Sequence, residues 1–171
     1  MATLKQVKNI KLVICDVDGV LTDGKIIYDG NGIESKNFDV QDGLGLTLLK
    51  KCGIMTAIIS ARASDVVAHR AKDLGIDHVY TAAYPKINAY RALVKDLKVD
   101  DRHVCFIGDD LPDLAVMKQV GLAVAVSNAV AEVKRVAHYT TRRSGGSGAV
   151  REVVEKILKS QGLWSKILER I

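Results

Sequence analysis

Residues 11–23 read KLVICDVDGVLTD, and this stretch decides the fold that we expect for the whole chain. The apolar run 12–15 is rich in β-branched residues, which suits a strand buried on both faces of a sheet. Asp16 and Asp18 follow it directly. Because burying an unpaired carboxylate is costly, this pair requires a cation, hydrogen bonds or both, and a hard divalent ion such as magnesium is the simplest solution. A turn that uses Asp and Gly for local backbone bonds is the alternative reading of the stretch.

The composition is typical of one globular domain. A chain of 171 residues is long enough to bury a core, and we expect a single domain over residues 1–171. Its 25 basic and 20 acidic side chains give a net charge of +5, which mildly favours anionic small molecules, although an ordinary solvated surface explains it equally well. Few aromatic residues and no long basic run argue against nucleic acid as a partner.

The cysteine and histidine patterns bear on compartment and metal type. Cys15, Cys52 and Cys105 share no CxxC spacing, and two of them lie in expected core strands. The four histidines are scattered without the spacing of zinc ligands. No segment approaches the roughly 20 apolar residues of a membrane span, and the N-terminus does not read as a signal peptide. We therefore expect a reduced, cytoplasmic protein with neither zinc nor a membrane partner.

Residues 24–38, GKIIYDGNGIESKNF, predict a β-hairpin. Two β-prone segments flank the sequence Asp29-Gly30-Asn31-Gly32, which is strong turn chemistry. The insertion is too short to be a domain of its own. Because exposed hairpins with apolar tips often form partner surfaces, this one is a candidate contact with another subunit.

Strand and helix patterns alternate along the rest of the chain. Asp42 is the expected cap of a helix that ends at Gly53, and a flexible glycine loop over 145–148 is expected before the last long helix. Further strands are expected at 54–59, 78–82, 103–107, 122–126 and 138–141, and further helices at 64–74, 86–97, 112–120, 129–137 and 149–159. The tail 160–171 is too apolar for a free end, so we expect it to pack as a helix on this or another subunit. This alternation predicts an α/β fold with a doubly wound, mostly parallel sheet and helices on both faces.

Polar residues collect where the expected strands stop. These residues are Asp16, Asp18, Ser60, Lys86, Asp109, Asp110 and Asp113. Because the C-terminal ends of parallel strands lie along one edge of a sheet, they should converge on one crevice. Carboxylates, a hydroxyl and a cation together match the needs of phosphoryl transfer, which depends mostly on positioning and charge neutralisation. Each one alone has an ordinary explanation, such as a solvated lysine, a turn serine or helix-start aspartates.

The set resembles the haloacid dehalogenase superfamily of phosphatases. The motifs of that family occur here in its order: DxD at Asp16 and Asp18, then Ser60, Lys86, and GDDxxD over 108–113. The match runs from about Lys11 to Gln161. The segments DVDGVLTDG, FDVQDGLG (38–45), GDDLPD and HYTTRRSGGSGAVRE (138–152), with a hairpin in place of a cap, are similar to a small capless branch that acts on sugar-acid phosphates. The chain departs from the pattern at Ala61, where glycine is usual, and at Gln41, where a basic residue is common.

The resemblance implies a role for each residue. Asp16 is the expected nucleophile, which forms an aspartyl-phosphate, and Asp18 is the expected general acid and base. Ser60 and Lys86 are expected to hold the phosphoryl oxygens. The expected cofactor is Mg²⁺, with Asp16, Asp18 (through its backbone carbonyl) and Asp109 as its ligands. Asp113 and Asp110 are expected to orient Lys86 or metal-bound water.

The resemblance also bears on substrate and assembly. Arg62, Asp42 and Arg142 are the residues expected to bind an anionic sugar-phosphate, since a guanidinium suits a carboxylate. The expected reaction is hydrolysis of 3-deoxy-D-manno-octulosonate 8-phosphate in lipopolysaccharide precursor synthesis. The expected assembly is a homotetramer in which the hairpins meet and a neighbour contributes to each site. The glycine loop with Arg142 or Arg143 is the candidate for this contribution, and a plain loop leading into the last long helix is the alternative interpretation.

Three alternatives remain open at this level. A receiver-type signalling domain also combines carboxylates, a hydroxyl and a lysine, but its acceptor aspartate lies mid-chain. A non-catalytic assembly module would use the same fold without turnover. A phosphatase of a nonulosonate 9-phosphate would keep the chemistry and change only the substrate.

Overall fold

The buried run after Lys11 forms the central strand of a parallel sheet. The computed structural model describes residues 7–169. Its six-stranded sheet has the order β5-β4-β1-β6-β7-β8, and every pairing in it is parallel. The strands are β1 (Leu12–Cys15), β4 (Met55–Ile59), β5 (His78–Tyr80), β6 (Val104–Gly108), β7 (Leu122–Ala125) and β8 (Tyr139–Thr140). The expected α/β sheet is therefore confirmed.

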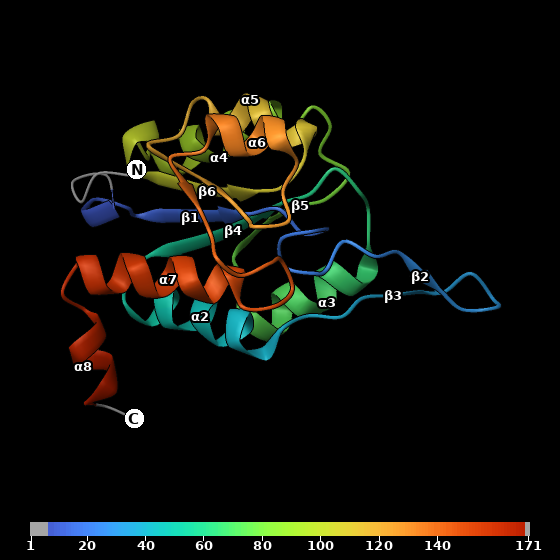
Figure 1. Ribbon diagram of the computed structural model, residues 1–171, viewed down its shortest axis with the longest axis horizontal. Helices are drawn as coiled ribbons and strands as arrows, with labels where there is room; N and C mark the ends of the chain where they lie inside the picture. The colour runs from blue at the N-terminus through green and yellow to red at the C-terminus, as the bar shows by residue number, and fades with distance from the viewer. Residues whose placement is uncertain (1–6, 170–171) are drawn as a thin grey trace.

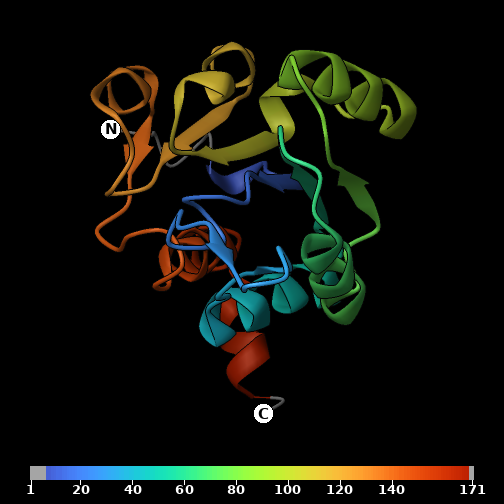
Figure 2. The ribbon, with the colours of Figure 1, turned by 90° about the vertical axis from the view of Figure 1, so that its right-hand side faces the viewer.

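Helices cover both faces of this sheet. One layer consists of α2 (Val40–Lys51), α3 (Asp65–Leu74) and α7 (Ala149–Ser160), and the other of α4 (Lys86–Leu97), α5 (Leu114–Met117) and α6 (Ala131–Val136) (Figures 1 and 2). Both faces of β1 are fully buried between these layers, which explains why its sequence is continuously apolar. Two short 3₁₀ helices, η1 (Asp101–His103) and η2 (Leu111–Asp113), flank β6.

The order of the strands reverses beside β1. The chain moves outward from β1 through β4 to β5, then crosses back and continues outward through β6, β7 and β8 on the other side. Open α/β sheets bind their ligands at the C-terminal ends of the strands next to such a reversal. The loops after β1, β4 and β6 meet at this point.

A hairpin projects beyond the C-terminal edge of the sheet. Its strands are β2 (Ile27–Tyr28) and β3 (Glu34–Ser35), which pair antiparallel, as the sequence predicts (Figure 1). Asp29 closes the turn, because its Oδ1 accepts hydrogen bonds from the backbone N–H groups of Asn31 and Ile33. The large apolar side chains of the hairpin are exposed: Ile26, Ile27, Tyr28 and Ile33.

The structure corrects three local expectations. Asp39, and not Asp42, caps α2, since the Asp39 carboxylate accepts from the N–H groups of Gln41 and Asp42. The expected helix 112–120 is shorter and divides into η2 and α5. The glycine loop is packed against the chain instead of being free: a Cβ on Gly145 would lie 1.8 Å from the carbonyl oxygen of Gly19.

The C-terminal tail packs as a helix, as its apolar residues predict. Helix α8 (Trp164–Leu168) contacts α7, where the Arg151 and Lys159 cations lie over the Trp164 ring, and Ile167 is buried. Ile171, also expected to pack, lies outside the described residues. Among the helices of residues 7–169, none combines the length and the apolar character needed to cross a membrane.

Candidate active site

The carboxyl ends of three adjacent strands bring the expected site residues together. Cys15, the last residue of β1, pairs with Ile58 of β4 and with Ile107 of β6. Asp16, Ser60 and Asp109 therefore leave neighbouring strands at the same edge of the sheet. Asp16 and Ser60 are both buried, although both are polar.

Lys86 connects two carboxylates at this edge. It is the first residue of α4, and its Nζ lies 2.7 Å from Asp16 Oδ1 and 2.7 Å from Asp113 Oδ1. Burial opposes the charge on this lysine, but the two carboxylates outweigh burial and raise the pKa of Lys86. The lysine therefore remains an ammonium group, suited to an incoming anion.

Asp113 supports the loop that follows β6. Its Oδ1 accepts from Lys86, and its Oδ2 accepts from the backbone N–H groups of Asp109 (2.9 Å) and Asp110 (3.3 Å). Gly108 leaves room for this contact, because a Cβ there would lie 2.5 Å from Asp113 Oδ2. Asp113 thus positions Lys86, as the resemblance implies, while Asp110 caps η2 through the N–H of Leu111.

The donor set fits a hard divalent cation. One carboxylate oxygen from each of Asp16, Asp109 and Asp113 lies within 4.8 Å of the others. Both oxygens of Asp113 already accept hydrogen bonds, whereas Asp109 Oδ1 is buried without a hydrogen-bond partner among the described residues. A buried oxygen left in this way is costly unless an ion satisfies it. The ligands are therefore best assigned to Asp16 and Asp109, with Asp113 as their support.

The electrostatics of the two carboxylates agree with this assignment. Burial, followed by the charge of Asp113, raises the pKa of Asp16 to about 6. Burial, followed by the charge of Asp16, raises the pKa of Asp109 to about 8. Burial and mutual repulsion therefore favour the protonated forms of Asp16 and Asp109. A divalent cation bound between them would instead stabilise both ionised carboxylates.

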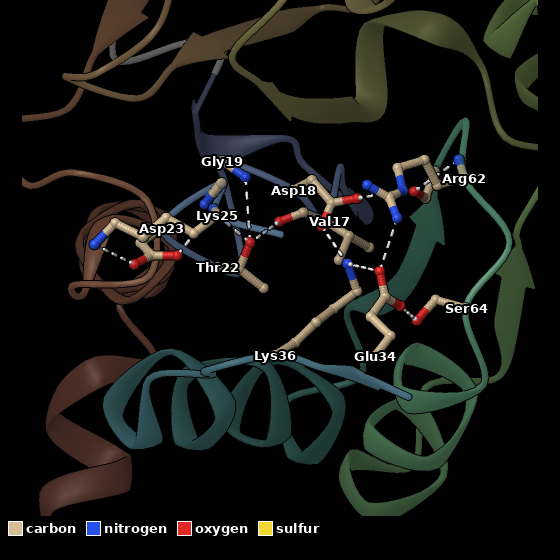
Figure 3. Close-up of polar contacts among 12 residues, drawn as sticks. Val17, Asp18, Gly19, Thr22, Asp23, Lys25, Glu34, Lys36, Arg62 and Ser64 are labelled. Atoms are coloured by element: carbon tan, nitrogen blue, oxygen red, sulfur yellow. Dashed lines mark hydrogen bonds and ion pairs between the residues drawn. The ribbon is translucent and has the colours of Figure 1, made fainter. Parts of the chain in front are cut away.

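The loop after β1 is fixed by contacts to distant segments. Gly19 has a φ of +90°, and a Cβ there would lie 2.1 Å from Asp109 Oδ2, so only glycine fits. Asn128 donates to the Gly19 carbonyl oxygen and accepts from the Gly145 N–H at 2.7 Å. The Thr22 hydroxyl accepts from the N–H of Gly19 and donates to the Val17 carbonyl (Figure 3). Sequence reasoning missed Asn128, for which the sequence alone offers no signal.

The Asp18 carboxylate points into a second cluster of charges, which includes Lys36 and Arg62 (Figure 3). Lys36 Nζ donates to Asp18 Oδ1, and Arg62 Nε lies 3.9 Å from Asp18 Oδ2. Sequence reasoning missed Lys36 and its second partner, Glu34, because both belong to a hairpin interpreted only as a contact surface. The expected role of Asp18 as a metal ligand, through its backbone carbonyl, stays a prediction.

Two expected substrate ligands lie elsewhere. Asp42 is buried, and each of its two oxygens accepts from a backbone N–H, that of Gly148 or Arg151, so it caps α7 and faces the protein interior instead of a substrate. Arg142 lines a separate groove of about 820 Å³ between α2 and α7, together with Gln41 and Arg143. None of the three carboxylates that could bind a metal, Asp16, Asp109 and Asp113, lines this groove. Within one chain, only Arg62 of the three is near the expected acid and base.

Comparison with known proteins identifies close relatives. Residues 59–153 match the model of the haloacid dehalogenase-like hydrolases. A curated 3-deoxy-D-manno-octulosonate 8-phosphate phosphatase of Yersinia pestis is 46% identical over 158 residues, which are 92% of this chain and 84% of the relative. The Moraxella catarrhalis phosphatase of the same description, solved with magnesium, phosphate and the sugar acid, is 45% identical with a TM-score of 0.95 over 98% of this chain and 96% of that one.

A third relative was solved with another divalent metal. The cobalt-bound phosphatase of Haemophilus influenzae is 40% identical, with a TM-score of 0.89 over 92% of each chain. Both structures were therefore solved with a divalent cation, the class of ion that the Asp16 and Asp109 carboxylates suit.

Proposed function

Because the chain belongs to the haloacid dehalogenase-like hydrolases, we propose that it is a magnesium-dependent phosphatase of 3-deoxy-D-manno-octulosonate 8-phosphate. The observation that carries this proposal is the bridge from Lys86 to Asp16 and Asp113, beside the unsatisfied oxygen of Asp109. It joins a nucleophile, a cation for the phosphoryl group and a metal ligand at one edge of the sheet.

The first half of the reaction transfers the phosphoryl group to the protein. An Asp16 oxygen attacks phosphorus, and the bond from phosphorus to the sugar oxygen breaks. Asp18 gives its proton to the departing sugar oxygen, so the free sugar acid leaves as an alcohol. Lys86 and the Ser60 hydroxyl hold the oxygens of the transferring group.

The second half releases phosphate. Water attacks the phosphorus of the aspartyl-phosphate, Asp18 takes the proton of that water, and Asp16 leaves as a carboxylate. Asp18 is protonated again, ready for the next turnover. The carboxylates of Asp16 and Asp109 and the backbone carbonyl of Asp18 would hold magnesium, which neutralises the two anions that must meet.

The surroundings of Arg62 support an acidic sugar as the substrate. Its guanidinium is partly exposed beside Asp18 and is oriented by Glu34 Oε1 at 2.8 Å and the Tyr28 hydroxyl at 3.2 Å. An oriented guanidinium suits the carboxylate of a sugar acid. The net charge of +5 favours the same class of anion.

We further propose a homotetramer in the cytoplasm. Pairing of hairpins between subunits would cover the exposed Ile26 and Ile33 and could bring a neighbour's Arg142 to the open crevice. Light scattering on the intact protein and on an Ile26→Glu, Ile33→Glu variant tests this assembly, and a fully active, selective monomer would remove it. The free thiols of Cys15, Cys52 and Cys105 support a reducing compartment.

A panel of phosphate esters tests the function. With magnesium, the octulosonate 8-phosphate should be hydrolysed with a higher kcat/KM than a nonulosonate 9-phosphate or p-nitrophenyl phosphate. A preference for the nonulosonate would change the substrate but keep the chemistry. The absence of turnover with every ester would instead favour the non-catalytic assembly module.

A further inference from the structure

The stem of the hairpin supplies a buried lysine to the acid and base of the reaction. Lys36 follows β3 directly, and only 1% of its side chain is exposed. Its Nζ contacts Asp18 Oδ1 and lies 3.3 Å from Glu34 Oε1 (Figure 3). A buried ammonium group requires such partners, so the position of Lys36 is determined by these two carboxylates.

Glu34 attaches this lysine to the edge of the sheet. Its Oε1 accepts from Arg62 Nη2 at 2.8 Å, and its Oε2 accepts from the Ser64 hydroxyl at 2.6 Å. Arg62 follows β4, and Ser64 precedes α3. Ser64 makes no side-chain hydrogen bond to the start of α3, and its hydroxyl donates to Glu34 of the hairpin instead. The network therefore fixes the base of the hairpin to the scaffold.

The two oxygens of Asp18 have different surroundings. Lys36 donates its hydrogen bond to Oδ1, whereas Arg62 Nε lies 3.9 Å from Oδ2, beyond hydrogen-bond range. Holding one oxygen of a carboxyl group fixes the orientation of the whole group. The oxygen left over is the one that can exchange a proton with a ligand.

We propose that Lys36 is a positioning residue for proton transfer, holding Asp18 through Oδ1 so that Oδ2 exchanges the proton with the sugar oxygen and later with water. The hairpin is then part of the machinery of the reaction as well as a candidate contact surface. This inference rests on the proposed function and adds no chemical step: the proton moves from Asp18 to the alcohol and returns from water.

Two esters with different leaving groups distinguish a positioning role of Lys36 from a purely structural one. The ratio kcat/KM covers the steps up to departure of the leaving group. A sugar alkoxide needs a proton to depart, whereas p-nitrophenolate is stable without one. Misplacing an acid by about 1 Å can cost about 10²-fold, so a badly placed Asp18 should slow only the first kind of ester. General damage to the site would slow both equally.

The experiment compares Lys36→Met with Lys25→Met. Lys25 is an exposed lysine of the same segment, ion-paired with Asp23 at 3.2 Å, and serves as the matched control. For each variant, kcat/KM is measured with the octulosonate 8-phosphate and with p-nitrophenyl phosphate in saturating magnesium. For Lys36→Met, kcat/KM should fall about 10- to 100-fold with the sugar phosphate and less than about 3-fold with the aryl phosphate. For Lys25→Met, kcat/KM should remain unchanged with both esters.

Glu34→Gln is the second variant, and it decides the matter if Lys36→Met does not fold. It weakens the contact of Glu34 with Lys36 while keeping the shape of the side chain. Because Glu34 also orients Arg62, this variant is measured with a simple alkyl phosphate, which has no carboxylate, against p-nitrophenyl phosphate. A loss smaller than that of Lys36→Met, and larger on the alkyl ester than on the aryl ester, is expected. An equal loss on both esters, or no loss, would overturn the inference and leave the proposed function intact. A wild-type protein that hydrolyses neither ester would overturn both.

Discussion

Replacing Asp42 by Asn separates its structural role from the substrate-binding role that the sequence suggested. The Asp42 carboxylate accepts from Arg151 N at 2.7 Å and from Gly148 N at 3.2 Å, and only 1% of the residue is exposed. Burial raises its pKa from 3.8 to about 6, with a further rise from Asp39, while the two backbone bonds and Arg143 oppose the rise. The folded protein therefore binds the Asp42 proton more tightly than the unfolded chain does.

The sign of the pH dependence follows from this difference. The stabilising contribution of the raised pKa is complete below the unfolded value, and it is lost as the pH rises through about 6. Between about pH 4.5 and about pH 7.5 the loss amounts to about 2 kcal/mol. Asn cannot ionise and keeps one acceptor oxygen, so Asp42→Asn loses about 1–2 kcal/mol at low pH through the missing hydrogen bond. The advantage of the wild type should therefore shrink or reverse at neutral pH.

Urea unfolding of both proteins across this pH range measures the difference, in which the other titrating groups cancel. Asp77→Asn is the control, because its exposed ion pair with Lys50 belongs to a class worth at most about 1 kcal/mol. A stability difference that stays constant with pH would refute the reasoning. Because Asp42 is buried and both of its oxygens bind the backbone at the start of α7, KM should also remain unchanged. A large rise in KM in a folded variant would restore the substrate-binding role.

Three further substitutions test the site. Gly19→Ala places a Cβ where Asp109 Oδ2 lies, 2.1 Å away, so magnesium titration of activity should show an affinity about 10- to 100-fold weaker. Lys86→Met leaves its buried carboxylate partners without their cation, and the free energy of unfolding in chelator should fall by about 3–5 kcal/mol at neutral pH. Asp18→Asn should lower kcat by about 10²- to 10⁴-fold, and full activity would exclude it as the acid and base.

The strands and the crevice were predictable because their signals are local. An apolar run comes directly before Asp16, and another comes directly before the carboxylates of the GDDxxD segment. Each run forms a buried strand, and the parallel pairing of β1 with β6 brings the ends of the two strands together. The positions of Asp16, Lys86 and Asp109 therefore followed from the order of the strands.

The contacts of Asp42, Lys36 and Asn128 could not be predicted in this way. Each depends on a partner from another part of the chain, at separations of 106, 18 and 109 residues for the bonds to Gly148, Asp18 and Gly19. Asp42 was predicted to cap α2, because a cap is normally a residue at the start of its own helix. Asp39 caps α2 instead, and Asp42 accepts hydrogen bonds from the backbone at the start of α7. Lys36 is a charged residue in a hairpin with exposed strands, and only the tertiary structure reveals its burial.

The central claim is that Asp16 carries the phosphoryl group between the two halves of the reaction. Rapid acid quenching during turnover, followed by mass spectrometry of the intact protein and of its peptides, tests it most directly. The account predicts that one phosphoryl group appears on the peptide containing Asp16, requires magnesium, and is absent from the Asp16→Asn variant. Turnover by Asp16→Asn, or a phosphoryl group on any other residue of the wild type, would contradict it.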